Sequence, residues 1–179
     1  MKTFLKVLIV ILVIVAIPLI VALFVKGDYA VERSVLINKP VSEVFNYTKY
    51  LHNQDQYSKW AQMDPNMKKT YRGIDGTVGA VYAWDSEADS VGKGEQEITS
   101  IIENQKIEYD LRFIEPFETT DHAYLVFDAN TNEQTMVRWG FFGEMKYPMN
   151  LMLLFVDMDE MLGPDLQIGL QNLKSNLEK

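Results

Sequence analysis

Residues 148–177, PMNLMLLFVDMDEMLGPDLQIGLQNLKSNL, decide the fold of this chain. The run Asn150–Leu162 is apolar almost all round and predicts a first helical segment. Gly163-Pro164-Asp165 predicts a break and a new helix start, because proline is tolerated at the first helical position and aspartate suits the positive end of a helix. Beyond this point, four leucines at helical spacing form one apolar stripe: Leu166, Leu170, Leu173 and Leu177. A helix with such a stripe must be covered, and the strands predicted before it can cover it.

The residues before this stretch predict a run of antiparallel strands. In the clearest strand, Ile107–Phe113, apolar residues face one way and charged residues face the other. Six further strands are predicted from similar patterns and intervening turns, at Ala30–Ile37, Lys69–Arg72, Ala80–Asp85, Glu95–Glu103, Asp121–Asp128 and Thr135–Glu144. Two short helices are expected after the first strand, over Val41–Leu51 and Asn53–Met63. The sequence therefore predicts an α+β fold, in which a curved seven-stranded antiparallel sheet wraps around the long C-terminal helix.

The N-terminal segment, residues 1–27, is separate from this domain. Val7–Val25 contains nineteen residues without a polar side chain, and as a helix it would extend about 28 Å, close to the thickness of a bilayer's hydrocarbon core. A cleaved signal peptide is the alternative, but its apolar region is usually only about 7–15 residues long. The length favours a retained single-pass anchor, which contacts the membrane through residues 4–25.

The remaining residues, 28–179, are expected to fold as an independent domain. The basic residues on the two sides of the apolar run are nearly balanced: Lys2 and Lys6 precede it, and Lys26, Arg33 and Lys39 follow it. The positive-inside tendency is therefore weak, and we expect a short cytoplasmic tail with an extracytoplasmic domain.

Composition excludes several kinds of partner and chemistry. The net charge of the chain is −8, and residues 28–179 hold fourteen of the seventeen bases and all twenty-five acids, a net charge of −11. Such acidity argues against nucleic acid or an anionic lipid surface as the main partner. The absence of cysteine excludes disulfides, thiolate metal sites, cysteine nucleophiles and a lipoprotein anchor. No metal-binding motif or phosphate-binding glycine loop is present, so neither a metal nor a cofactor is expected.

The sequence offers little support for catalysis. The two histidines, His52 and His122, are far apart and belong to no motif. His122 alternates with apolar residues of its strand and is therefore expected to face outward. Glu95 and Glu97 share a strand face, but paired acids on a solvated face are common, and catalysis needs perturbed groups in a cleft. We therefore predict no catalytic residue.

Several short motifs together carry a family resemblance. They are Pro40 with Val44-Phe45, Trp60 after the second helix, Gly76 and Gly79 before Tyr82-x-Trp84, Gly92-x-Gly94, and Gly163-Pro164-Asp165 leading to Gly169-Leu170-x-x-Leu173-Lys174. With these, Ala30–Leu177 resembles the SRPBCC superfamily, the START-like helix-grip proteins often labelled polyketide cyclase/dehydrase. Relatives often carry a second tryptophan three residues after the first, where this chain has Met63. The resemblance implies a fold rather than one activity.

The resemblance also implies a cavity between the curved sheet and the last helix, commonly used for apolar ligands. The sequence independently supplies apolar walls, and the candidate ligand-binding residues are Trp60, Tyr82, Trp84, Tyr109, Phe113, Phe127, Trp139, Phe141, Met149 and Met152. Tyr109 is the candidate for a single polar contact with the ligand. Stripes of this kind are also typical of an ordinary core.

Three classes of function remain open. The leading hypothesis is a membrane-tethered module that binds a lipid or another apolar small molecule. The alternatives are a cyclase- or hydrolase-type enzyme of the same fold and a co-chaperone-like protein-interaction module. A polar group with a shifted pKa in the cavity would favour the enzyme, whereas a collapsed cavity with an exposed apolar patch would favour the interaction module.

Overall fold

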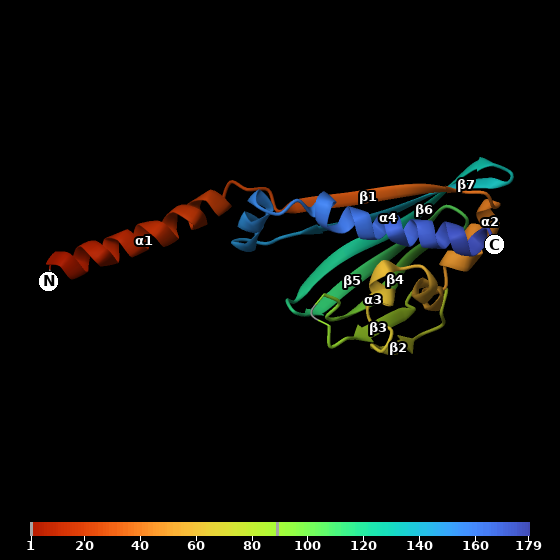
Figure 1. Cartoon of the computed structure of the whole chain (residues 1–179), viewed down its shortest axis with the longest axis horizontal. Helices are drawn as coiled ribbons and strands as arrows, with labels where there is room; N and C mark the ends of the chain where they lie inside the picture. Colours follow the sequence, from red (N-terminus) through yellow and green to blue (C-terminus); the bar gives the residue numbers. More distant parts are fainter. Residues whose placement is uncertain (1, 89) are drawn as a thin grey trace.

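The computed structural model describes residues 2–88 and 90–179, which form one curved sheet with a long helix beside it (Figure 1). In chain order the elements are α1 (Lys2–Ala22), β1 (Asp28–Ile37), α2 (Val41–Thr48), the 3₁₀ helix η1 (Leu51–Gln56), α3 (Lys59–Met63), β2 (Lys68–Arg72), β3 (Val81–Asp85), β4 (Lys93–Ile102), β5 (Lys106–Glu115), β6 (Thr119–Thr131), β7 (Gln134–Glu144), the 3₁₀ helix η2 (Met149–Leu154) and α4 (Met158–Leu177). The sheet order is β1-β7-β6-β5-β4-β3-β2, and all neighbouring strands are antiparallel. The predicted fold class is confirmed.

The core lies between α4 and the sheet, where both elements present apolar side chains. Leu166, Leu170 and Leu173 of the predicted stripe are completely buried in one cluster with residues of the sheet. On β5, Ile107 and Tyr109 point into this cluster while the residues between them lie nearer solvent. The periods of 3.6 and 2.0 residues therefore place these apolar faces against one another, as the sequence predicts.

The C-terminal stretch differs from its prediction in where the helices begin and end. Residues 150–162 do not form one helix: η2 ends at Leu154, and α4 begins at Met158. The reason is Asp157, whose carboxylate accepts hydrogen bonds from the backbone N–H groups of Asp159 and Glu160, at 2.8 and 3.3 Å. This N-cap requires a non-helical backbone at Asp157, which separates the two elements.

The predicted break at Gly163-Pro164-Asp165 is also wrong, because α4 continues through Pro164 to Leu177. Proline removes one helical hydrogen bond, the one to the carbonyl of Glu160. Glu160 is exposed, so water can solvate that carbonyl. The adjacent Gly163 leaves room for the guanidinium of Arg33, which pairs with Asp159 at 2.7 Å and holds the first turns of α4 against β1.

The region after β1 contains α2 as predicted, but the expected helix over Asn53–Met63 is divided. The 3₁₀ helix η1 ends at Gln56, and α3 begins at Lys59. Ser58 lies between them, and its hydroxyl accepts a hydrogen bond from the backbone N–H of Ala61. This second N-cap sets the start of α3.

The N-terminal helix α1 projects from the end of the domain where β1 begins (Figure 1). Its residues Thr3–Ala22 have a mean hydropathy of 3.2, and none of them except Ala22 is buried, so α1 is long and apolar enough to cross a membrane. A signal sequence near an N-terminus can have the same properties. The division of the chain at residue 27 and the orientation in the membrane stay predictions.

Candidate functional site

A cavity of about 280 Å³ lies between the sheet and the N-terminal half of α4. The sheet supplies most of its wall, η1 and α3 close one side, and Leu162 and Leu166 of α4 close another. Its described lining is Gln54, Ser58, Trp60, Ala61, Met67, Tyr82, Trp84, Ser90, Val91, Gln96, Leu111, Phe113, Ala123, Trp139, Phe141, Leu162 and Leu166. The lining is mostly aromatic and aliphatic, which is typical of a small-molecule site.

Trp139 of β7 is the central wall residue. Its ring makes edge-on contacts with Tyr57 and Trp60, with centroid separations of 5.8 and 6.2 Å. Gly169 of α4 makes this position possible, because a Cβ atom there would lie 2.7 Å from the Trp139 ring. The Trp139 ring thus lies between Trp60 of α3 and Gly169 of α4, and we call this arrangement the Gly169 clamp. It keeps the ring at the cavity wall.

A second aromatic group lies where β3, β4 and β5 pair. Trp84 contacts Phe113 edge-on at 5.9 Å, and its indole N–H donates to the carbonyl of Val91 at 3.3 Å. Gly94 lies opposite Trp84 in the strand register, and a Cβ there would be 2.6 Å from the indole ring. The glycine therefore lets the tryptophan lie flat across β4 and form this part of the wall.

A few polar groups enter the cavity. Gln54, Ser58 and Gln96 line it and are almost fully buried. The Tyr82 hydroxyl is buried and has no hydrogen-bond partner within the described residues, and burial raises its pKa. Among the described lining residues none carries a formal charge at neutral pH. The cavity can therefore satisfy a neutral hydrogen-bonding group but offers no counter-ion.

The structure brings six of the ten candidate residues to the cavity: Trp60, Tyr82, Trp84, Phe113, Trp139 and Phe141. Tyr109 and Phe127 share the inner face of the sheet but belong to the packed core outside the lining. Phe127 instead contacts Phe45 of α2 edge-on at 5.4 Å. These two residues were misplaced because strand alternation predicts which face of the sheet a side chain lies on. It does not predict which helix packs over that side chain.

Met149 and Met152 lie outside the cavity, contrary to the expectation that they close it. They belong to η2, which is beyond the end of β7 and leaves both side chains exposed. Of the described residues that follow β7, only Leu162 and Leu166 line the cavity.

Sequence analysis missed several wall residues, chiefly Gln54, Ser58, Gln96 and Ala123. Gln96 and Ala123 could have been found, because each shares the inward face of its strand with apolar residues, Gln96 with Ile98 and Ala123 with Leu125. Gln54 and Ser58 had no such signal, since they lie in and after a short 3₁₀ helix without apolar periodicity.

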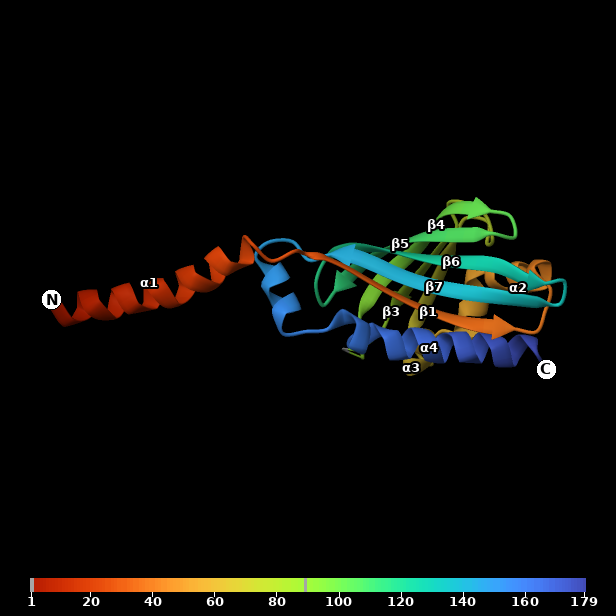
Figure 2. The same ribbon diagram turned by 90° about the horizontal axis from the view of Figure 1, so that it is seen from above.

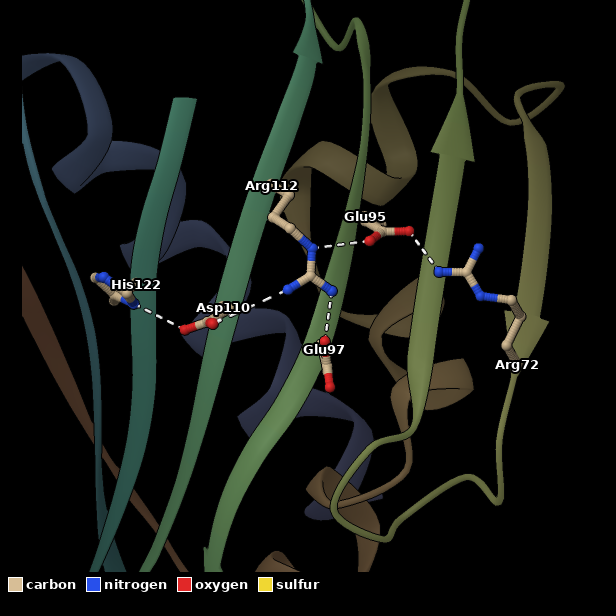
Figure 3. Close-up of polar contacts among 6 residues, drawn as sticks. All are labelled: Arg72, Glu95, Glu97, Asp110, Arg112 and His122. Carbon is tan, nitrogen blue, oxygen red and sulfur yellow. Dashed lines mark hydrogen bonds and ion pairs between the residues drawn. The ribbon is translucent and has the colours of Figure 1, made fainter. Parts of the chain in front are cut away.

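The outer face of the sheet carries a polar network (Figure 3). Arg112 donates to Glu95 at 2.8 Å and to Glu97 at 2.5 Å, and Arg72 donates to Glu95 at 2.6 Å. Hydrogen bonding from Arg112 lowers the pKa of Glu95, opposed in part by burial. Within residues 2–88 and 90–179, no cluster of three or more histidine, aspartate or glutamate side chains could hold a metal ion. The network is an arrangement of ion pairs across neighbouring strands.

His122 lies at the edge of this network, where its Nδ1 is 2.8 Å from Asp110 Oδ1 (Figure 3). We expect His122→Ala to leave ligand binding in the cavity unchanged and to alter the free energy of unfolding by less than about 1 kcal/mol, because a polar contact between partly exposed side chains contributes little. Urea unfolding and the photolabelling assay described below measure both quantities. Lost labelling with an intact fold would instead assign a function to the outer face.

No protein-family model matches the chain, and no curated protein matches it. Solved structures do match the chain. A protein of Nitrosospira multiformis superposes with a TM-score of 0.59 at 16% identity, and the match covers 83% of this chain and 96% of that protein. The Aha1 dimer from Colwellia psychrerythraea has a TM-score of 0.57 at 13% identity, with coverage of 84% and 96%. Ara h 8.0201 has a TM-score of 0.54 at 12% identity, with coverage of 85% and 99%. At such identities the similarity shows the fold alone, and this chain has the helix-grip fold.

Proposed function

We propose that this protein is a membrane-tethered module that binds one small apolar molecule, or one apolar chain of a lipid, in the cavity between the sheet and α4. The observation that supports this most is the cavity of about 280 Å³ itself, bordered by aromatic rings, two of which glycines allow into place. Proteins with the helix-grip fold commonly bind hydrophobic ligands, which agrees with this reading.

The energetics of the cavity favour an occupant. The aromatic and aliphatic walls of the cavity have no protein neighbours on their inner side, so they lose packing contacts there when no ligand is bound. Water solvates such apolar walls poorly, so an apolar ligand that fills the space would stabilise the fold.

The lining also suggests the chemistry of the ligand. The volume lies just below the range of about 300–1,000 Å³ typical for small-molecule pockets, so a complete two-chain phospholipid is too large. The amides of Gln54 and Gln96 suit a neutral hydroxyl or carbonyl group. We therefore expect an uncharged amphiphile with one apolar chain or ring system.

Binding is favoured over acid–base catalysis by the same lining. Tyr82 is the only ionisable side chain among the described lining residues, and burial raises its pKa. A tyrosine that holds its proton this firmly is a poor general base near neutral pH, although it remains a good hydrogen-bond donor.

Filling the cavity tests the proposal. Ala123 lines the cavity on β6, and Ala123→Leu should occupy part of the space. We expect the full chain in phosphatidylcholine nanodiscs to be labelled saturably by a diazirine-tagged long-chain fatty alcohol, with adducts near Trp84 and Trp139. Ala123→Leu should lose most of this labelling while its melting temperature stays equal or rises. Mass spectrometry of proteolytic fragments measures the adducts.

Ala129→Leu is a matched control, because Ala129 lies on the same strand but is exposed and outside the cavity. It should label like the unmodified chain. The corresponding fatty acid should label less than the alcohol, since the described lining supplies no cation for its carboxylate. Labelling that does not saturate, or that is the same in Ala123→Leu, would remove the support for a ligand cavity.

A further inference from the structure

An exposed apolar surface lies where α1 meets the domain. We call it the juxtamembrane apolar surface, and it consists of Leu23, Phe24, Met149, Met152, Leu154 and Phe155. These side chains are between 44% (Met152) and 83% (Phe24 and Phe155) exposed. So many large apolar side chains gathered on one small part of a protein usually mark a contact with a protein or a membrane.

The segment that carries this surface is fixed to the domain and is not a loose loop. Leu153 and Val156 pack against the hydrophobic core, so η2 presents apolar side chains both inward and outward. The backbone N–H of Met145, just before η2, donates to the carbonyl of Gly27 at 3.0 Å. The outward side chains are therefore held at one place on the domain.

The same segment is also fixed to the end of α1. The buried amide of Asn150 donates to the carbonyls of Ala22 and Val25, both at 2.8 Å. Figure 2 shows η2, in blue, next to the C-terminal end of α1. A chain cleaved after Val25 would lose both acceptors and leave this amide group without them, which favours a retained helix.

The position of η2 relative to a bilayer follows from this attachment. No residue from Thr3 to Val21 is buried, and Ala22 is buried at the junction with the domain. The span Thr3–Ala22 is strongly hydrophobic, and a helix of its twenty residues extends about 30 Å, the thickness of the hydrocarbon core. Its C-terminal end therefore lies at the membrane–water interface when α1 spans the bilayer. Because Asn150 holds η2 at that end, the juxtamembrane apolar surface lies at the same depth.

We propose that the juxtamembrane apolar surface is a second membrane contact of this chain, which enters the headgroup and upper acyl region of the bilayer beside α1. The partner is the lipid itself, and continuity with α1 identifies it. Residues 149–156 contain no charged side chain, and Asp157 follows them. The contact is therefore driven by apolar burial and does not need anionic lipids.

The aromatic end of the cavity lies at the same end of the sheet as the proposed membrane contact. Trp84 and Phe113 pair with the same residue of β4, Gly94, close to where β3 ends at Asp85 and β5 at Glu115. The antiparallel order puts these strand ends on the side of the sheet where β7 ends and β1 begins, which is the side of α1. For the proposed function, the consequence is that the aromatic end of the cavity faces the lipid surface. The membrane contact itself does not depend on what the cavity binds.

Single-cysteine labelling tests the contact directly, because the chain contains no other cysteine. Phe155→Cys, with Met152→Cys as a second variant, is labelled with an environment-sensitive fluorophore in the full chain, in phosphatidylcholine nanodiscs. Ile74→Cys is the matched control, since Ile74 is 76% exposed in the connection between β2 and β3, at the end of the sheet away from α1. Circular dichroism of each variant checks that the fold is intact.

We expect the labels at positions 155 and 152 to lose most of their emission when the lipid acyl chains carry a spin-label quencher, and to resist aqueous iodide. The label at position 74 should show the reverse. Phosphatidylglycerol added to the nanodiscs should not strengthen the lipid quenching. Iodide access at positions 155 and 152 equal to that at position 74 would overturn the proposal. So would protection from both quenchers, which would mean that protein covers the surface, such as a second copy of the chain.

Discussion

Replacing Leu170 with alanine is expected to lower the free energy of unfolding by about 3–5 kcal/mol. Leu170 is completely buried at the centre of the α4 stripe and does not line the cavity. Its truncation loses the transfer free energy of the buried methyl groups and leaves a new void, because the surrounding sheet can relax only partly. Urea unfolding of the full chain in nanodiscs measures this, and tryptophan fluorescence reports on the domain alone because α1 contains no tryptophan.

Leu166→Ala is the informative comparison. Leu166 is equally buried and is one turn earlier on the same helix, but its side chain lines the cavity. Its truncation enlarges a space that already exists, so we expect a clearly smaller loss of stability than for Leu170→Ala. An equal or larger loss would mean that this part of α4 is ordinary core, and it would count against the ligand cavity.

The fold could be predicted because its decisive signals are local. The alternation of Ile107, Tyr109 and Leu111 with charged residues requires a strand with one buried face. The leucine stripe of α4 requires a covering surface of similar length, and the run of antiparallel strands supplies one. These patterns do not depend on the turns between the elements. The observed helix and strand boundaries therefore differ from the predicted ones without changing the fold class.

The C-terminal stretch shows where such reasoning fails. An apolar run such as 150–156 has the same composition whether it closes a cavity or meets lipid, so periodicity cannot separate the two. What separates them is the contact between Asn150 and the end of α1, which joins residues 128 positions apart. Pro164 was interpreted as the start of a second helix, whereas α4 begins at Met158, after the N-cap Asp157.

The candidate site could be predicted only in part for a related reason. Strand alternation identifies the inner face of the sheet, and six candidate residues on that face or beside it line the cavity. It does not tell how α2 and α3 divide that face between them. Phe127 and Tyr109 lie on the inner face but in the packed core, whereas Gln54 and Ser58 reach the cavity from η1 and the turn after it.

Trp139→Ala is expected to have the second large effect, on stability and binding together. Trp139 is only 7% exposed and contacts Tyr57, Trp60 and Gly169, yet part of its ring borders the cavity. We expect the free energy of unfolding to fall by about 3 kcal/mol, the low end for a tryptophan-to-alanine change, because one side of the ring has few packed neighbours to lose. Saturable labelling by the fatty alcohol should also disappear, since the widened cavity no longer encloses a single chain.

Trp139→Phe supplies the matched variant for this prediction. A phenyl ring can keep an edge-on contact with Tyr57 or Trp60, so it should retain more stability than alanine and some of the labelling. The two measurements, urea unfolding and adduct mapping, separate a wall residue from a core residue. A loss near 5 kcal/mol in Trp139→Ala with labelling unchanged would show that the ring supports the core alone and that the ligand lies elsewhere. We expect instead a smaller loss of stability together with lost labelling, because the Gly169 clamp holds the Trp139 ring at the cavity wall.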